Sequence, residues 1–415
     1  MLKDLVTVEW APASDPLDPA PSWVDITDQV RVVEWETGAR NSREEAAAAG
    51  TFSVEFNNRG DVGGAVVADP TEWYRWRQVR VVRTVDDLPL MAGTLTGIDH
   101  DFNRTPHAVF SRMVGRDHIG LLSEGSTDAD FATYATGAPL GQVEAKRIGG
   151  ADGYVTDGGA ADVATWLLPG IDVQFAAPMP VFVESKQTGN ALALLRDYLD
   201  FERGHLVTPA GGGLVLYGRG TLTVAAASAA EYTLSDDPAD WPGGAYRYLR
   251  GGLVWANPDD SYVDDAVVGV AGVKDPQRVH ETPTGYPPSS WTRADRTTLV
   301  DTHWAKATAQ MVVSLGRQTD AYPRQVEMYV AGPAAATVDT NHPGANAAML
   351  SVVELTHEGS VYKLLIVGAR HRIDQQGWKY TPSFLSLDRV TAAFAGAGLF
   401  TLGTSALGGS DILGP

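Results

Sequence analysis

The chain has 415 residues, of which 44% are hydrophobic and 20% are charged. This length predicts several domains of about 100–200 residues each. The 51 acidic residues outnumber the 32 basic ones and give a net charge of −19, which excludes a protein that grips nucleic-acid phosphates with an excess of Lys and Arg. Cysteine is absent, which excludes disulfides and thiolate metal sites. No apolar run approaches the ~20 residues that span a bilayer, so we expect no membrane insertion.

Residues 1–120 have the pattern of short antiparallel strands. Apolar and polar residues alternate over residues 52–56, the two-residue period of a half-buried strand, and turn residues follow at 57–61. Further strand candidates lie at residues 78–85, 95–98 and 108–114. Strands this short and this closely spaced predict an antiparallel barrel or sandwich.

Residues 121–219 combine a helical pattern with short strand patterns, which predicts a small α/β domain. Leu192, Leu195 and Leu199 fall on one face of a helix predicted over residues 190–203, and Gly204 stands where its C-cap belongs. Two short strands around a Gly-rich turn follow within residues 205–219.

Residues 220–390 predict a second β-rich unit with one flanking helix. The helix is expected at about 301–315, because Trp304, Met311 and Leu315 share an apolar face, with Asp301 as N-cap. The expected strands lie at residues 222–225, 267–270, 326–330, 350–355, 363–367 and 384–387.

Residues 391–415 form a Gly-rich apolar segment that we predict to be a C-terminal arm, too rich in Gly for a stable helix. Its large apolar residues cannot bury themselves, and burial on a partner would contribute about 1.5–3 kcal/mol each. We expect the arm to dock on a neighbouring subunit or on another protein. The interaction residues are Leu399, Phe400, Leu402, Leu407 and Leu413.

The sequence lacks the common catalytic and cofactor-binding motifs, which favours a protein that is not an enzyme. The sequence contains no HExxH, no GxxxxGK[ST] and no GxGxxG, which removes the common zinc-protease, P-loop and dinucleotide-binding interpretations. We therefore expect no catalytic residues and no cofactor. Two acidic pairs, Asp128 with Asp130 in an expected loop and Asp197 with Asp200 on the expected helix, are the candidates for a glycosidase pair, which needs facing carboxylates.

An Asp-rich segment is the weak candidate for a metal site. Asp259, Asp260, Asp264 and Asp265 offer the oxygen ligands that Ca²⁺ prefers. The segment lacks the Gly and the terminal Glu of an EF-hand loop, so a solvated loop is the favoured interpretation.

Several segments resemble minor tail proteins of siphophages that infect actinobacteria. Residues 23–30 resemble a W-x-D-[VI]-T entry, and residues 50–60 resemble a G-T-x-x-V-x-[LF]-x-N-x-x-G strand and turn. Residues 191–219 are similar to the helix and Gly-rich strands of tail hub proteins, and residues 367–378 to the family's v-x-g-x-x-H-x-I…W ending. The helix around Trp304 and the Leu-Gly pairs of the C-terminal arm fit the same family.

The resemblance implies a structural virion protein, a hub at the tail tip in the phage baseplate. Its fold class would be mainly β with some α: two tube-like antiparallel β-barrel domains, 1–120 and 220–390, separated by the small α/β domain. A homotrimer would form a ring that continues the tail tube, with distal tail or tube proteins above and tip or fibre proteins below. DNA would pass through the lumen without specific binding, and we expect an acidic lining with few arginines.

Two alternatives stay open at this stage. One is a distal tail protein, a hexameric adaptor with one barrel per subunit. The other is a tail-tip glycan hydrolase or receptor-binding protein, for which Trp73, Tyr74 and Trp76 would form a sugar platform. Subunit number separates the hub from the adaptor.

Overall fold

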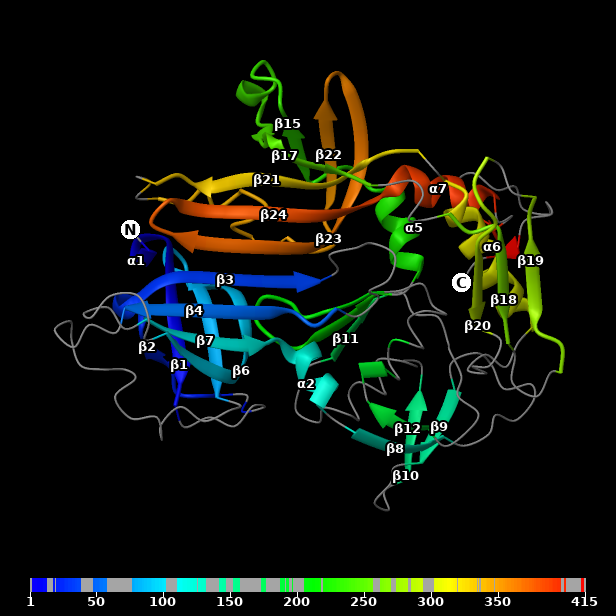
Figure 1. Ribbon diagram of the computed structural model, residues 1–415, viewed down its shortest axis with the longest axis horizontal. Coiled ribbons are helices and arrows are strands. Elements are labelled where there is room, and N and C mark those ends of the chain that lie inside the picture. The colour runs from blue at the N-terminus through cyan, green and yellow to red at the C-terminus, as the bar shows by residue number, and fades with distance from the viewer. Residues whose placement is uncertain are drawn as a thin grey trace.

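The chain is described by a computed structural model (Figure 1). The described residues are 2–12, 18, 20–38, 48–57, 77–101, 110–124, 126–131, 142–146, 152–156, 173–176, 187–190, 192–193, 196, 205–217, 219–256, 262–269, 274–282, 285–293, 302–318, 320–333, 335, 337–346, 348–396, 399–400 and 412–413. As predicted, this part of the chain is mainly β with some α.

The largest element is a fourteen-stranded, mostly antiparallel sheet that contains two groups of seven strands. The first group, called unit 1, comprises β1 (Val6–Ala11), β2 (Val24–Asp25), β3 (Val30–Gly38), β4 (Thr51–Asn57), β5 (Gln78–Arg83), β6 (Leu88–Asp101) and β7 (Phe110–Arg116). The second, unit 2, comprises β15 (Tyr232–Ser235), β16 (Tyr246–Arg247), β17 (Leu249–Trp255), β21 (Pro323–Ala331), β22 (Val352–His357), β23 (Ser360–Asp374) and β24 (Gly377–Ser386).

The two units repeat one order of strand pairing. In unit 1 the neighbours run β2-β1-β5-β6-β7-β4-β3, and in unit 2 they run β16-β15-β22-β23-β24-β21-β17. Each strand of unit 1 thus has a counterpart that stands at the same place in the chain order of unit 2. The units differ at β15, which runs parallel to β22 whereas β1 runs antiparallel to β5, and in a long insertion between β17 and β21.

One strand pair joins the units into a single sheet. β3 pairs antiparallel with β23, with Trp35 opposite His371 and Glu34 opposite Arg372. The two predicted β-rich regions are therefore continuous through their hydrogen bonds. Among the described strands neither unit closes into a barrel, so the arrangement as two barrels stays a prediction.

The part of the chain that connects the two units in sequence contains smaller sheets, which lie to the right of the unit 1 strands in Figure 1. A four-stranded sheet comprises β8 (Ser126–Phe131), β9 (Gln142–Lys146), β10 (Asp152–Thr156) and β12 (Gln187–Asn190), and a three-stranded one β11 (Val173–Ala176), β13 (His205–Val207) and β14 (Leu214–Tyr217). Most of the predicted helix at 190–203 lies outside the described residues; Leu192, Ala193 and Arg196 are helical.

The insertion of unit 2 contains a third small sheet and the predicted helix. The sheet comprises β18 (Asp265–Val268), β19 (Gln277–His280) and β20 (Ser290–Arg293), and the helix is α6 (Thr302–Gly316), close to the expected bounds. The remaining elements are α1 (Leu2–Leu5), α2 (His118–Glu124), α5 (Arg219–Ala227), α7 (Leu387–Gly396), two 3₁₀ turns (Thr27–Gln29 and Trp241–Gly243) and the paired β25 (Leu399–Phe400) and β26 (Ile412–Leu413).

Two expected elements were wrong in type. Residues 222–225 lie in helix α5 rather than in a strand, and residues 391–396, assigned to the arm, complete helix α7. Both helices contribute to a second apolar cluster with α6 on one side of the sheet, where Leu222, Met311 and Val390 are buried. The apolar side chains of this Ala-rich chain find their partners in this cluster, which explains why both segments are helical despite weak local signals.

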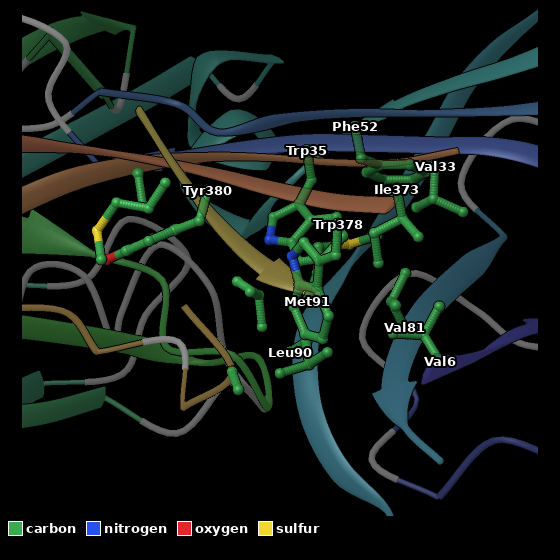
Figure 2. Close-up of a cluster of buried hydrophobic side chains, with 14 of the residues drawn as sticks. Val6, Val33, Trp35, Phe52, Val81, Leu90, Met91, Ile373, Trp378 and Tyr380 are labelled. Atoms are coloured by element: carbon green, nitrogen blue, oxygen red, sulfur yellow. The ribbon is translucent and has the colours of Figure 1, made fainter. Parts of the chain in front are cut away.

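The main core lies on one face of the large sheet and draws on both units. Trp35 of β3 and Trp378 of β24 are fully buried and close together, with Leu90 and Met91 of β6 beside them (Figure 2). Because successive residues of a strand point to opposite faces, Val33 and Trp35 of β3 face this core while Glu34 faces away. Unit 1 and unit 2 therefore share one hydrophobic core.

A buried arginine ties the units together at a second place. Arg83, at the end of β5, is 4% exposed. Its guanidinium donates to the carbonyl oxygen of Ala345 at 2.8 Å and to that of Thr340 at 3.3 Å, both in unit 2. Its Nε donates to Asp86 at 2.8 Å, which offsets the buried charge.

We expect Arg83→Met to lower the free energy of unfolding by about 2–3 kcal/mol, because the carbonyl oxygen of Ala345 loses its donor in a buried place. Arg278→Met is the matched control: this arginine also pairs with a carboxylate, Asp265, but its side chain is 61% exposed. The control should lose less than about 1 kcal/mol. Equal losses in urea unfolding of the two variants would contradict the role of Arg83.

Candidate functional site

The face of the large sheet that points away from the core is lined with charged side chains. Alternation along each strand places most of them there, because residues two apart share a face. Arg31 stands at the register shift between Val30 and Val32 of β3 and lies beside Glu55. We call this surface the charged face. It crosses six adjacent strands of both units and comprises Arg112 and Arg116 of β7, Glu55 of β4, Arg31, Glu34 and Glu36 of β3, Arg370, Arg372 and Asp374 of β23, Lys379 of β24 and Glu327 of β21.

Cations and carboxylates are interspersed on the charged face. At the junction of the units, Arg370 Nε donates to Glu34 Oε1 at 2.7 Å, and Arg372 lies 3.5 Å from the other oxygen of Glu34. Arg372 also donates to Asp374 at 2.9 Å. The charges of the two units therefore neutralise each other where β3 meets β23.

Further ion pairs extend this pattern to both sides of the junction. Arg31 lies 3.4 Å from Glu55, and Lys379 donates to Glu327 at 3.1 Å. The hydrogen bond to Glu327 raises the pKa of Lys379. Each pair on such an exposed face contributes about 1 kcal/mol or less, so the pattern matters for the potential of the surface more than for stability.

Two open hollows lie on the charged face. The first, with a volume of about 530 Å³, is lined by Glu34, Glu36, Arg112, Arg116 and Arg370 among others. The second, of about 490 Å³, lies beside Arg31, Arg372, Asp374 and Lys379. Their charged lining is mixed in sign, which suits a solvated surface better than a pocket for one small molecule.

Directly behind the charged face, an aromatic cluster fixes the junction from the core side. The ring of His371 stacks on Trp35 with centroids 4.3 Å apart, and His371 accepts a hydrogen bond from Trp378 Nε1 at 3.2 Å. Tyr380 lies 4.8 Å from the His371 ring. Burial lowers the pKa of His371 to about 3, so the imidazole is neutral and can accept this bond.

The two predicted metal residues that the structure describes are engaged by other groups of the protein. Asp264 is 1% exposed and accepts a hydrogen bond from the backbone N–H of Ser289 at 2.9 Å, whereas Asp265 binds Arg278 through both oxygens at 2.8 Å. Asp259 and Asp260 lie outside the described residues. Within the described ranges, no cluster of three potential metal ligands occurs; the metal site stays a prediction.

The predicted interaction residues are only partly described. Leu399 and Phe400 form β25, which pairs with Ile412 and Leu413 of β26, and β25 lies against α7. Leu402 and Leu407 lie outside the described residues. Part of the arm thus folds back on itself, while its docking on a neighbour stays a prediction.

The other sequence candidates are not brought together in the described part of the chain. Asp128 and Asp130 lie in strand β8, not in a loop as expected. Asp197, Asp200 and the aromatic residues 73–76 lie outside the described residues. No helix among the described residues is long and apolar enough to cross a membrane.

The charged face was missed by the sequence analysis. Its signal was present, because charged and apolar residues alternate at Glu34-Trp35-Glu36 and at Arg370-His371-Arg372. Nothing in the sequence, however, indicated that these two segments, more than 330 residues apart, are hydrogen-bonded neighbours.

Acid should destabilise the protein through His371. Its pKa is about 3 when folded and about 6.5 when unfolded, so the unfolded chain binds the extra proton between these values and stability falls as the pH drops from 6.5. His371→Phe should keep the stacking on Trp35 and reduce this slope by up to about 1.4 kcal/mol per pH unit. Unfolding measured between pH 7 and 4.5 tests this.

His371→Phe also removes the acceptor of Trp378 Nε1, which changes the stability at every pH. The absolute stability of this variant is therefore not the quantity to compare. The comparison is between slopes, and His280→Phe, at an exposed histidine, is the control. An unchanged slope for His371→Phe would show that His371 is not the buried neutral group inferred here.

Comparison with known proteins identifies the fold. No protein-family model and no curated protein matches the sequence. Among solved structures, the 43 kDa tail protein of prophage MuSo2 from Shewanella oneidensis is similar with a TM-score of 0.58 at 14% identity, over 93% of this chain and 99% of that one. A tail protein from Neisseria meningitidis MC58 has a TM-score of 0.56 at 12% identity, over 91% and 96%. The chain therefore has the fold of prophage tail proteins, which confirms the resemblance at that level; the link to siphophages of actinobacteria stays a prediction.

Proposed function

We propose that the chain is a structural protein of a phage virion, a hub at the tail tip whose three copies form a ring that continues the tail tube. One observation carries this proposal: the chain contains the same order of strand pairing twice, and β3 and β23 join the two units edge to edge in one sheet. Three such chains supply six similar wall segments. A trimer would thereby match a sixfold tube without six identical chains.

The charged face is the surface that we assign to the lumen of this ring. It crosses both units without interruption, as a continuous tube wall requires. The expectation of an acidic lining with few arginines does not hold for this face, because it carries Arg31, Arg112, Arg116, Arg370 and Arg372.

The mixed lining is compatible with passage of DNA for a different reason. Strong binding to DNA arises when cations release the counterions of many phosphates. Glu34 lies between Arg370 and Arg372, and Glu327 holds Lys379. A phosphate would have to displace these carboxylates, so we propose that DNA passes without being held.

The remaining parts of the proposal follow the tail location. Distal tail or tube proteins would lie above the ring and tip or fibre proteins below it, with the C-terminal arm as one contact. We propose no catalytic activity and no cofactor. The ion pairs of the charged face support this, since they engage its charged groups with each other.

The mass of the assembled protein tests the proposal. We expect the purified full chain at high concentration to sediment with three times the 44.2 kDa mass of one chain. Six chains would favour the distal tail adaptor instead, and a single chain that stays monomeric at the highest soluble concentration would contradict a ring-forming protein. Arg278→Met, which alters an exposed ion pair of the small β18–β20 sheet, is a control that should leave the mass unchanged.

A further inference from the structure

The repeat of the two units extends to the register of individual residues. In unit 1 one row across the sheet runs Gly97, Val114, Ser53, Glu34, through strands β6, β7, β4 and β3. In unit 2 the corresponding row runs Gly368, Ser383, Gln325, Val254, through β23, β24, β21 and β17.

The irregularities of the strands repeat as well. The β6–β7 ladder shifts register between Leu95 and Gly97, and the β23–β24 ladder shifts between Ile366 and Gly368. The backbone N–H of Leu95 donates to the carbonyl oxygen of Arg77 at 2.9 Å, and that of Ile366 donates to Ser351 at 3.1 Å. Two chain segments with the same bulge, the same row and the same extra hydrogen bond are equivalent in structure.

This equivalence identifies an edge that is paired in unit 2 and that no described strand pairs in unit 1. A strand has two edges, and β24 takes one edge of β23. On the other edge, β22 covers residues up to Leu365 and β3 covers Gly368 to Ile373. On β6, β7 takes one edge and β5 covers the other up to Thr94. No described strand pairs with that second edge from Gly97 to Asp101.

The strand that corresponds to β3 is β17, and its outer edge has no strand partner in the described part of the chain. β17 pairs with β21 on one side alone. Val254 and Trp255 on this edge strand are 43% and 39% exposed. Such an edge with exposed apolar side chains is a surface for association.

We infer that β17 of one chain pairs antiparallel with residues 97–101 of β6 in a neighbouring copy, as β3 pairs with β23 within the chain. The inference rests on the proposed ring and names its subunit contact. Glu34 stands opposite Arg372, four residues after Gly368. By the same count Val254 stands opposite Asp101, four residues after Gly97. We assign a second copy of this chain to the edge, because the pairing of β3 with β23 within the chain already shows the same kind of contact.

The two junctions differ in chemistry although they share a backbone arrangement. The positions of Arg370 and Arg372 are taken by Asp99 and Asp101 in β6, and the position of Glu34 is taken by Val254 in β17. The junction between copies therefore cannot reuse the ion pairs of Glu34. Main-chain hydrogen bonds and the apolar side chains of β17 hold it together.

Engineered disulfides test the register, since the chain has no cysteine of its own. Opposite residues of antiparallel strands have Cα atoms about 4.5–5.5 Å apart, within the range that a disulfide bridges. We expect full-length Val254→Cys/Asp101→Cys to form covalent dimers and trimers under mild oxidation. Val254→Cys/Leu88→Cys is the matched control, because Leu88 lies at the far end of β6 and is covered by β5; it should stay uncrosslinked, as should each single variant.

The outcomes separate this inference from the proposed function. If the wild-type protein has the mass of a trimer but the Val254/Asp101 pair does not crosslink, or the control pair crosslinks equally, the ring stands and this junction is wrong. If the wild-type protein is a monomer at high concentration, the proposed ring itself fails.

A second variant guards against a failure of the double cysteine variant to fold. Val254→Asp places a charge at the edge of β17 next to the acidic residues of β6. We expect Val254→Asp to raise the dissociation constant of the trimer at least tenfold. Its melting curve at low concentration should be unchanged. Val361→Asp, at a 61% exposed valine at the start of β23, should leave the trimer intact. A trimer unaffected by Val254→Asp would overturn the inference.

Discussion

The pairing of β3 with β23 is the contact on which the rest of the structure depends. It joins residues more than 330 positions apart and sets, in one register, both faces of the sheet. On one face Glu34 meets Arg370 and Arg372; on the other Trp35 stacks on His371. A shift of one residue would turn the charges into the core and the tryptophan into solvent, so this register is strongly selected.

Several features of the molecule follow from this junction. The shared core, in which Trp35 and Trp378 pack against Leu90 and Met91, exists because the two units form one sheet (Figure 2). The charged face is continuous for the same reason. Arg83 adds a second link between the units, through the carbonyl oxygen of Ala345. The two units therefore form one continuous sheet with two similar halves, and their repeat is the basis for the proposed contact with a second copy.

Local patterns in the sequence predicted the local structure well. Alternation over residues 52–56 and 326–330 identified β4 and β21, and the apolar face around Met311 identified helix α6. Residues 222–225 were assigned to a strand because a short apolar run fits a strand or a helix equally, and the packing of α5 in the second apolar cluster decided the outcome. Residues 391–396 were assigned to the arm because the segment is rich in Gly, and the packing of α7 in the same cluster explains why they are helical.

Features that depend on contacts between distant segments could not be predicted from the sequence. The junction of β3 and β23 has no local signal, so neither the charged face nor the neutral, buried state of His371 was predicted. The Asp-rich segment had a clear composition, yet Asp265 is engaged by Arg278 and Asp264 by a backbone N–H. The repeat of the two units is visible in strand pairing and bulges, while the residues at equivalent positions differ in charge.

The central claim is that the two units of each chain form part of a tube wall with the charged face inside. Cryo-electron microscopy of the assembled ring, at a resolution that separates strands, tests it most directly. We expect three chains around the axis, with Glu34, Arg370 and Arg372 pointing into the bore. A ring in which these residues point outward, or lie buried against another protein, would contradict it.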